Sequence, residues 1–389
     1  MKKIAILGAT GSIGRQALDI IEKNPGRFSV TAVTAHRSGD EIIKTAKKFG
    51  AGYIGLTGCA GDIEFEKKVP KGIKVGFGIQ GLLESCSAGD PDIVLIAVVG
   101  IAGLPPLIEC LDRGTNVALA NKESLVCGGH IVTERLKSSK SEIFPVDSEL
   151  CAVYQCLKGL DTTGLRRVIL TASGGPFLSW SKEDIEKATV EQALRHPNWR
   201  MGKKVTVDCA TYMNKGIEVI ETKWLFGITP DMIDVTVHRQ SIIHSMIEYN
   251  DGAVIAQMGP TDMRQAIQYA FGHPERLNSV VGHLDFTAIK TLTFEEPDTD
   301  KFPCFRHARE ALREGGSLPL IMNAANEAAV DLFLEKRIAF GDIEKSVAFA
   351  MNKFSHLKGN TLIEIYNTDK EVKNYIYDNF DKVRISAHA

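Results

Sequence analysis

The segment Asp147-Ser148-Glu149 places two carboxylates on either side of a hydroxyl. It follows residues 142–146, which the apolar pattern predicts as a buried strand. Because α/β sheets place their ligands at the carboxyl ends of strands, these side chains are candidates for a metal or substrate site. A plain helix start is the structural alternative, since Asp, Ser and Glu are all favoured at helix N-termini.

A second polar group follows in residues 214–218, which read Asn-Lys-Gly-Ile-Glu. On a helix, Asn214 and Glu218 share one face, and an exposed ion pair between Lys215 and Glu218 is the structural alternative. Together with the two earlier carboxylates, Glu218 completes a set of three acidic side chains without a cysteine–histidine cluster. Such a set favours a hard ion, Mg²⁺ or Mn²⁺, over structural zinc.

A glycine-rich turn lies near the start of the chain. Gly8, Gly11 and Gly14 have the spacing GxxGxxG, between a predicted strand at 3–7 and a predicted helix at 12–24. The glycines permit a tight turn and close approach of a pyrophosphate, and the helix N-terminus supplies N–H groups and a positive dipole. The motif therefore predicts a dinucleotide site, with a purely structural turn as the alternative.

The end of the second predicted strand indicates which dinucleotide. An NAD enzyme carries an acidic residue there, which binds the ribose 2′-hydroxyl. This chain instead has Ala35-His36-Arg37-Ser38. An arginine and a hydroxyl suit a 2′-phosphate, so the segment favours NADPH over NADH, unless Arg37 is simply a solvated loop residue.

The elements that must position these residues alternate between strand and helix up to about residue 147. Strands without polar alternation indicate a parallel sheet covered on both faces, so we expect an α/β, doubly wound, Rossmann-like domain at 1–147. The predicted strands are 3–7, 28–34, 92–98, 116–120 and 142–146, and the predicted helices are 12–24, 41–49 and 104–111.

The pattern then changes to that of an α+β domain at 148–272. Its predicted strands are 167–172, 235–238, 245–249 and 253–258, and residues 205–225 are predicted to be helical. Residues 273–303 hold several prolines and glycines and little periodicity, so they are interpreted as a linker. From 304 to 389 the chain is predicted to be a C-terminal α-helical domain.

Composition limits the class of protein. The chain has 389 residues, 44% hydrophobic and 24% charged, with a formal net charge of −2, which is typical of soluble globular proteins of two or three domains and gives no basic surplus for nucleic acid. The most apolar stretch, 93–104, is too short to span a membrane, and the first residues lack the apolar core of a secretory signal. We therefore expect a cytoplasmic protein, whose eight cysteines are reduced.

The order of these motifs along the chain resembles one known family, the 1-deoxy-D-xylulose 5-phosphate reductoisomerases. The resembling segments are GATGSIG at 8–14, ALANKESLV at 118–126, PVDSE at 145–149, LTASGGPF at 170–177, RHPNWRMGKKVTVD at 195–208, MNKGIEVIE at 213–221, QSIIHSM at 240–246 and MNAANE at 322–327. The resemblance implies an NADPH domain, a catalytic domain with a mobile lid near 195–203, and a C-terminal helical bundle.

The resemblance also implies an activity, its cofactors and an assembly. The family converts 1-deoxy-D-xylulose 5-phosphate to 2-C-methyl-D-erythritol 4-phosphate, by rearrangement and reduction, in the non-mevalonate route to isoprenoid precursors. The reaction uses NADPH and one divalent ion, Mg²⁺ or Mn²⁺, and the enzyme is a homodimer whose only other partner is the small sugar phosphate. No nucleic acid or membrane partner is expected.

The resemblance assigns site residues in four groups. NADPH would meet Thr10, Gly11, Ser12, Ile13, His36, Arg37, Ser38, Asn121 and Glu123, with Gly202 closing over it. The metal ligands would be Asp147, Glu149 and Glu218. Lys122, Ser148, Glu149 and Glu218 would meet the reacting end of the sugar, and Ser173, Cys209, Asn214 and Lys215 its phosphate. His196 and Trp199 would act from the lid, with Ser241, His244 and Met263 nearby.

Four positions depart from the usual family pattern. Leu150 replaces a histidine after the DSE segment, and Cys209 replaces a serine, so a thiol stands where a better hydrogen-bond donor is expected. His36 replaces a glycine before the basic cofactor residue, and Arg239 replaces a proline. A paralogue that acts on a related ketose phosphate is therefore an alternative.

Two further alternatives come from other classes of function. A dehydrogenase of the aspartate-semialdehyde type would need a nucleophilic cysteine with a histidine partner, for which Cys127 and Cys151 are the candidates. A non-catalytic NADPH-binding sensor would not need the carboxylates, Lys122 or the lid tryptophan, all of which are present.

Overall fold

The computed structural model describes residues 1–160, 162–199 and 201–386, with the backbone alone for 381–386. The chain forms two compact units, each built from three segments. Unit 1 comprises Met1–Ser124, Val132–Cys151 and Asp262–His283, and unit 2 comprises Leu125–Ile131, Ala152–Thr261 and Leu284–Ala389. This grouping differs from the predicted division at 147, 272 and 303, because residues 262–283 pack with the N-terminal sheet.

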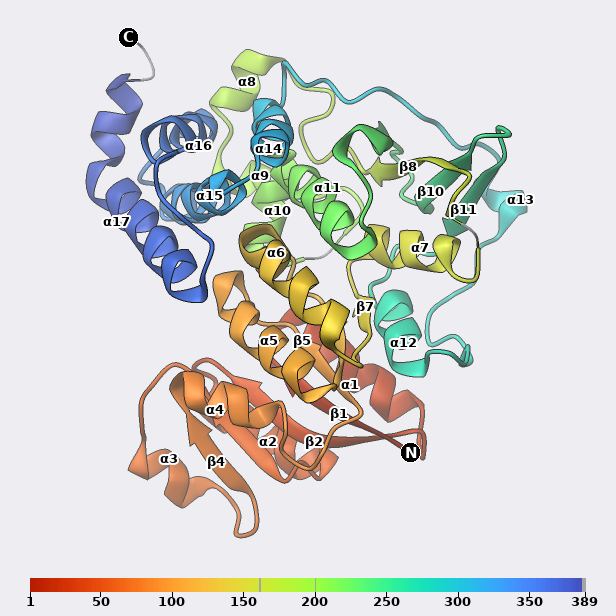
Figure 1. Ribbon diagram of the computed structural model, residues 1–389, viewed down its shortest axis with the longest axis vertical. Coiled ribbons are helices and arrows are strands. Elements are labelled where there is room, and N and C mark those ends of the chain that lie inside the picture. The colour runs from red at the N-terminus through yellow and green to blue at the C-terminus, as the bar shows by residue number, and fades with distance from the viewer. Residues whose placement is uncertain (161, 200, 387–389) are drawn as a thin grey trace. The chain divides into compact units, whose positions relative to one another are not determined.

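Unit 1 contains a seven-stranded sheet in the order β4-β3-β2-β1-β5-β6-β7, with every pair parallel (Figure 1). The strands are β1 Lys2–Leu7, β2 Phe28–Ala35, β3 Tyr53–Leu56, β4 Lys74–Phe77, β5 Ile93–Ile96, β6 Asn116–Leu119 and β7 Ile143–Pro145. Strand order reverses between β1 and β5, and α/β sheets bind their ligands at such a switch point. The predicted doubly wound fold is confirmed.

The helices of unit 1 connect these strands. They are α1 Ser12–Lys23, α2 Gly39–Phe49, α3 Ile63–Lys68, α4 Gly78–Ser85, the 3₁₀ turn Gly100–Gly103, α5 Leu104–Arg113 and α12 Arg264–Gly272. Helix α12 contacts α1, β6 and β7. The sequence reading missed β3, α3, β4 and α4, because both short strands contain a glycine, which weakens a strand pattern, and α3 carries four charges in six residues. Helices α6 Glu123–Ser138 and α7 Ser148–Leu157 contribute residues to both units.

Unit 2 contains a mixed sheet of four strands in the order β11-β10-β8-β9. Strand β8, Leu165–Ala172, pairs in parallel with β9, Ile233–Val237, and antiparallel with β10, Ile243–Tyr249, which pairs antiparallel with β11, Val254–Met258. The α+β character predicted for this part of the chain is confirmed. The short helices α8 Lys182–Glu186 and α9 Val190–Ala193 follow β8.

Residues 205–225 were predicted to be one helical stretch, and this prediction was wrong in one respect. Two helices are present, α10 Lys203–Ala210 and α11 Met213–Phe226. Tyr212 separates them with a φ of 63°, in the left-handed region that non-glycine residues rarely adopt. A tyrosine gives no sequence signal for that conformation.

The C-terminal part of unit 2 is helical, as predicted. Its helices are α14 Pro303–Glu314, α15 Leu318–Leu334, α16 Gly341–Lys353 and α17 Leu362–Ser386, and the segment predicted as a linker contains one short helix, α13 Phe286–Ile289. Helix α15 contacts α14, α16 and α17, and most of its residues are buried. Among the residues that the structure describes, no helix is both long and apolar enough to cross a membrane.

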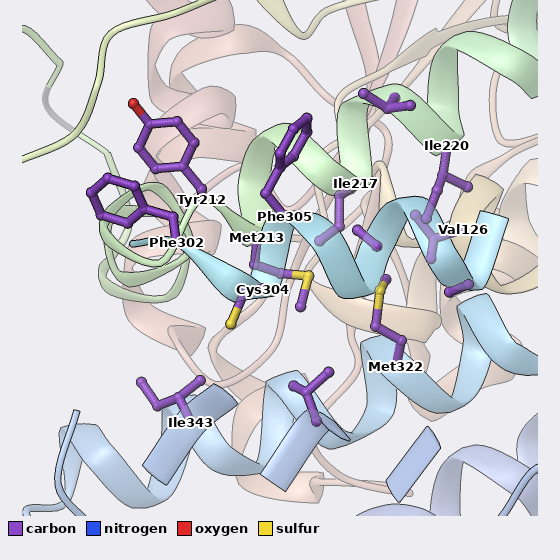
Figure 2. Close-up of a cluster of buried hydrophobic side chains, with 14 of the residues drawn as sticks. Val126, Tyr212, Met213, Ile217, Ile220, Phe302, Cys304, Phe305, Met322 and Ile343 are labelled. Atoms are coloured by element: carbon purple, nitrogen blue, oxygen red, sulfur yellow. The ribbon is translucent and has the colours of Figure 1, made fainter. Parts of the chain in front are cut away.

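Helices α11 and α14 pack closely in unit 2. Figure 2 shows Met213, Ile217 and Ile220 of α11 in one buried cluster with Phe305 of α14 and Met322 of α15. Gly216 makes the approach possible, since a Cβ atom there would overlap the Cβ of Ala308. The face of α11 that carries polar groups is thereby held on a close-packed support.

Candidate functional site

The glycine turn of unit 1 follows β1 at the switch point of the sheet. Gly8 has a φ of 89°, and a Cβ atom there would lie 2.6 Å from the carbonyl oxygen of Ala97. A Cβ atom on Gly14 would lie 2.5 Å from the Cα of Ala9. The turn therefore needs glycine at both positions, and it leads into α1, whose N-cap is Gly11. Thr10, Ser12 and Ile13 lie on this turn and the first helical residues, where N–H groups can face a phosphate.

The segment His36-Arg37-Ser38 follows β2, next to β1 in the sheet. All three side chains are exposed, and Ser38 is the N-cap of α2. His36 Nδ1 lies 3.1 Å from Thr57 Oγ1, so the imidazole contacts the segment that follows β3. Arg37 thus has an open position at the carboxyl end of the sheet, where a phosphate could pair with it.

Asn121, Lys122 and Glu123 follow β6. The Asn121 side chain is buried and donates to the carbonyl oxygens of Val98 at 2.9 Å and Gly100 at 2.8 Å, and its amide nitrogen also lies 3.1 Å from Glu123 Oε2. Asn121 therefore holds together the two segments that follow β5 and β6, which places Lys122 and Glu123 at the ligand-binding edge of the sheet.

Asp147, Ser148 and Glu149 follow β7 and begin α7. Lys122 Nζ lies 2.8 Å from Asp147 Oδ2, and both side chains are about nine-tenths buried, at 10% and 12% exposure. Asp147 Oδ1 accepts from the Glu149 N–H at 3.3 Å, and the Ser148 hydroxyl donates to Glu149 Oε2. The helix-start alternative and the ligand prediction are both compatible with this arrangement, because one oxygen of Asp147 accepts from the first turn of α7 while the other faces the Lys122 ammonium.

In unit 2, helix α11 carries Asn214, Lys215 and Glu218 on one face. The Asn214 amide and the Lys215 ammonium each donate to one oxygen of Glu218. The Lys215 and Glu218 side chains are 5% and 1% exposed, so the ion pair is buried and the structural alternative of an exposed pair is wrong. A buried charged pair is costly to desolvate and is a weak source of stability, so stability alone does not explain its position.

Ser173 follows β8 and contacts the predicted lid segment. Its hydroxyl lies 3.0 Å from His196 Nε2. His196 Nδ1 accepts from the backbone N–H groups of Asn198 at 3.2 Å and Trp199 at 3.0 Å, so in the neutral ring the proton is on Nε2, which donates to Ser173. Gly174 and Gly175, with φ of 90° and 66°, turn the chain so that the Gly175 N–H also faces the Ser173 hydroxyl, at 3.3 Å.

The same segment contacts the turn before β10. The Asn198 amide donates to the carbonyl oxygen of Arg239 at 2.6 Å and to the Ser241 hydroxyl at 3.0 Å. The Trp199 ring lies 6.0 Å from the ring of the buried His244. Asn198 was not predicted as a site residue, although it lies in the His-Pro-Asn-Trp motif. Arg200, within the predicted lid, lies outside the described residues.

Cys209 lies at the end of α10, next to the Ser173–Gly175 turn. A Cβ atom on Gly175 would lie 2.8 Å from the carbonyl oxygen of Cys209, so the two backbones touch directly. The Tyr212 N–H donates to the same carbonyl at 3.3 Å. Burial raises the pKa of Tyr212, whose ring stacks on Phe302 at 4.3 Å. The partly exposed Cys209 is thus held by contacts of its carbonyl group with Gly175, which follows β8, and with Tyr212, which precedes α11.

The predicted residues fall into two groups. Those in unit 1 are Thr10, Gly11, Ser12, Ile13, His36, Arg37, Ser38, Asn121, Lys122, Glu123, Asp147, Ser148, Glu149 and Met263. Those in unit 2 are Ser173, His196, Trp199, Gly202, Cys209, Asn214, Lys215, Glu218, Ser241 and His244. Met263 is the N-cap of α12.

A Rossmann-like sheet with a glycine turn at its switch point, and a second unit with buried polar and charged groups, define a dinucleotide-dependent oxidoreductase. Three family models match successive parts of the chain: 1-deoxy-D-xylulose 5-phosphate reductoisomerase at residues 4–129, its C-terminal domain at 143–226, and the DXP reductoisomerase C-terminal domain at 258–375. The chain belongs to the 1-deoxy-D-xylulose 5-phosphate reductoisomerase family.

Full-length relatives support this assignment. The chain is 45% identical to the 1-deoxy-D-xylulose 5-phosphate reductoisomerase of Clostridium kluyveri, over 98% of this chain and 100% of that protein. It is 47% identical to that of Thermoanaerobacter pseudethanolicus, over 97% and 98%. Both relatives are matched over nearly their whole length.

Solved structures agree with the fold. A DOX-P reductoisomerase in complex with NADPH, fosmidomycin and magnesium is 36% identical, with a TM-score of 0.94 and coverage of 99% of each chain. The Zymomonas mobilis 1-deoxy-D-xylulose 5-phosphate reductoisomerase in complex with NADPH is 36% identical, with a TM-score of 0.90, over 97% of this chain and 99% of that one.

The cysteines do not support the semialdehyde-type alternative. Cys127 and Cys151 are 4% and 2% exposed. Cys127 Sγ accepts from the amide of Asn323 at 3.5 Å. Reactive cysteines lie in accessible, electropositive surroundings, whereas these thiols are packed in the interior.

Proposed function

We propose that this chain converts 1-deoxy-D-xylulose 5-phosphate to 2-C-methyl-D-erythritol 4-phosphate, with NADPH and one divalent metal ion, in the non-mevalonate route to isoprenoid precursors. The observation that carries the proposal is the buried Asn214–Lys215–Glu218 group of α11, in a chain of this family that also keeps the Rossmann glycine turn. A sensor that only binds NADPH would need only the glycine turn. The buried charges of α11 therefore support binding and conversion of a second ligand, the sugar phosphate.

NADPH fits unit 1 because the turn at Gly8 and Gly14 leaves no room for side chains and opens onto the start of α1. Thr10, Gly11, Ser12 and Ile13 would hold the pyrophosphate through backbone N–H groups. His36, Arg37 and Ser38 would hold the 2′-phosphate. NADPH supplies the hydride that reduces the rearranged aldehyde, and Asn121, Glu123 and Gly202 would complete its site.

The carboxylates fit a divalent ion. Asp147, Glu149 and Glu218 offer only oxygen ligands, which Mg²⁺ and Mn²⁺ prefer. A bound ion supplies Lewis-acid polarisation of the substrate carbonyl. Lys122, held by Asp147 at 2.8 Å, would place a positive charge where negative charge develops on the sugar oxygens, and Ser148 would orient a neighbouring hydroxyl.

The substrate phosphate would be held in unit 2. Ser173 offers a hydroxyl oriented by His196, and Lys215 offers a positive charge. Asn214 and Cys209 would add two weaker donors at the start of α11 and the end of α10. A dianion in this position would also be favoured by the N-terminal dipole of α11.

A closing segment would exclude water from the reaction. His196 and Trp199 lie on the segment near 195–203, which the Ser173 and Ser241 hydroxyls and the His244 ring contact. In the proposed reaction these residues, with Met263, surround the sugar when the lid closes. The aldehyde would then be protected until hydride arrives.

The assembly and location are also proposals. We infer a homodimer in the cytoplasm. Strand β11 is the edge of its sheet, and its Val254 and Ile255 side chains are 50% and 39% exposed. An exposed apolar edge strand is an aggregation hazard in a monomer, so a second copy of the chain is a suitable cover.

The test is a reconstituted reaction with purified protein. We expect loss of NADPH absorbance only when 1-deoxy-D-xylulose 5-phosphate and Mg²⁺ or Mn²⁺ are both present, with 2-C-methyl-D-erythritol 4-phosphate identified by mass spectrometry and NMR. Faster turnover of another ketose phosphate would indicate the paralogue. NADPH binding without turnover would indicate the sensor, and metal-independent turnover blocked by thiol alkylation would indicate the semialdehyde-type dehydrogenase.

A further inference from the structure

The motif Met-Asn-Ala-Ala-Asn-Glu at 322–327 has no part in the proposed reaction, yet its polar side chains are buried in α15. Asn323 and Asn326 are both 0% exposed, and Glu327 is 9% exposed. Each asparagine uses its amide nitrogen, whereas within the described residues neither side-chain oxygen has a hydrogen-bond partner. Leucine would fill the same space without that cost, so stability alone does not explain these amides.

Asn326 contacts the helix that carries Cys209. Its amide donates to Asp208 Oδ1 at 2.7 Å, and Lys204 Nζ lies 3.0 Å from Asp208 Oδ2. Asp208 is 1% exposed and lies in the last turn of α10, where the helix dipole disfavours a carboxylate. A buried carboxylate in this position depends on its two donors.

Glu327 reinforces the same attachment. One of its oxygens lies 3.9 Å from Lys204 Nζ and the other 2.6 Å from Lys373 Nζ of α17. Lys373 also pairs with Asp369 at 2.9 Å, and these two carboxylates outweigh burial and hold its pKa above the usual range. The charges therefore form one connected network from α17 through α15 to α10.

Helix α10 connects two parts of the proposed site. Gly202, at the end of the lid segment, is its N-cap, and Cys209 lies in its last turn. The Cys209 carbonyl touches the backbone of Gly175, and no side chain separates them. A shift of α10 along or about its axis would therefore move the lid attachment, Cys209 and the Ser173 turn together.

We propose that Asn326 and Glu327 are positioning residues for substrate binding, which hold α10 through Asp208 and Lys204 and so set the geometry of the phosphate pocket. The C-terminal helices thereby control affinity for the sugar phosphate without touching it. This proposal rests on the proposed function of Ser173 and Cys209 in phosphate binding.

The chain offers a matched control for the test. Asn323 has the same residue type, helix and burial as Asn326, but its amide donates to Cys127 Sγ and to Glu327 of its own helix, so it is joined to α10 only indirectly, through Glu327. Asn326→Leu should raise KM for 1-deoxy-D-xylulose 5-phosphate about tenfold, by the loss of one charge-assisted hydrogen bond. Inorganic phosphate should become a weaker competitor by a similar factor. KM for NADPH and kcat should change less than about threefold, because the phosphate is bound equally in ground and transition states.

Asn323→Leu should change thermal stability as much as Asn326→Leu but raise substrate KM by no more than about threefold, because Asp208 keeps both of its donors and Glu327 keeps Lys373. Equal KM changes in both variants, or none in Asn326→Leu, would overturn the positioning role.

If Asn326→Leu fails to fold, the exchange Asp208→Asn with Asn326→Asp keeps one amide-to-carboxylate bond. Both single variants should raise KM and the double variant should restore it toward the wild-type value, and a double variant no better than the singles would also overturn the proposal. Absence of turnover in the wild-type protein would instead refute the proposed function.

Discussion

The dinucleotide site of unit 1 and the polar site of unit 2 are built in different ways. The first is made mainly of backbone: Gly8 and Gly14 are glycines because a Cβ atom would collide with the turn itself, and the start of α1 provides the N–H groups. The second is made of side chains that are charged and buried, such as Lys215 and Glu218. A backbone site tolerates changes of side chain that leave the turn intact, whereas a buried-charge site fails when one partner is removed.

The largest effect is expected at the buried-charge site. Glu218→Gln keeps the shape of the side chain but removes a charge that we assign to the metal and that neutralises Lys215. We expect kcat to fall at least about a hundredfold, since a Lewis acid contributes several kcal/mol to the barrier. Chelation should abolish wild-type activity, and added Mg²⁺ should restore it.

Glu221 is the control for this variant. It lies one turn further along α11 and is also 1% exposed, but it has no assigned role. Glu221→Gln should lower kcat less than about tenfold and should not change the metal concentration that gives half-maximal rate. A Glu218→Gln enzyme that kept full activity at low metal would remove Glu218 from the ligand set.

The next largest effect is expected from a substitution in the glycine turn of unit 1. Gly14→Ala places a methyl group 2.5 Å from the Cα of Ala9, so the turn must open. We expect the cofactor-free protein to lose about 1–3 kcal/mol of stability, as in other overpacked sites, and NADPH binding to weaken at least about tenfold.

Gly11→Ala is the matched substitution in the same turn. Its methyl group would approach only the Gly8 carbonyl oxygen, at 3.3 Å, so thermal unfolding of the cofactor-free protein should stay close to wild type. Equal loss of stability in both variants would show that the turn needs the backbone freedom of glycine at both positions, and not only room for a Cβ atom at Gly14.

The same contrast explains what the sequence could predict. The glycine turn was predicted because its parts are consecutive along the chain, between a strand and a helix that the apolar pattern also predicts. The Asn214–Glu218 face was predicted for the same reason, since a helix places residues four apart together. Its burial was not, because burial depends on tertiary packing, such as the contact of Gly216 with Ala308 of α14 about 90 residues further on, which supports the helix from another part of the chain.

Long-range polar contacts were beyond sequence reasoning. Asn326 and Asp208 are 118 residues apart, and no local period connects them. Asn198 lies in a recognised motif, but its contact with Ser241 depends on a turn in which Ser241 itself has a φ of 50°. Residues 262–272 were predicted to belong to the domain at 148–272 and residues 273–283 to a linker, whereas both group with the N-terminal sheet. The amphipathic pattern of α12 does not indicate which sheet it covers.

Within the dinucleotide site, Arg37 is the side chain on which specificity should depend. Arg37→Asp places a negative charge against the 2′-phosphate, so the ratio of kcat/KM for NADPH over NADH should fall about 10- to 100-fold, the equivalent of one charge-assisted hydrogen bond. Lys44→Asp makes the same change of net charge on the exposed face of α2 and should leave the ratio unchanged. Equal use of both cofactors by the wild-type protein would contradict the assignment of Arg37.

The smallest effect concerns the one proposed phosphate contact in unit 2 where the chain departs from its family. Cys209 provides a thiol, which is a weaker donor than the serine hydroxyl expected there. Ser173, Asn214 and Lys215 remain, so the phosphate is still bound. Cys209→Ser should therefore lower KM for 1-deoxy-D-xylulose 5-phosphate several-fold and leave kcat nearly unchanged, because this contact is the same in ground and transition states.

The result would also show whether the site in unit 2, like the backbone site in unit 1, tolerates a change of side chain. The Cys209 backbone is fixed by its contacts with Gly175 and Tyr212, so the serine hydroxyl should take the direction of the thiol. Cys209→Ala removes the donor and should raise KM by a smaller factor than the serine variant lowers it, since a thiol contributes little. A KM that is unchanged or higher in Cys209→Ser would mean that water or another group already binds the phosphate oxygen at this position. In that case the pocket has adapted around the thiol, and the family serine is not needed.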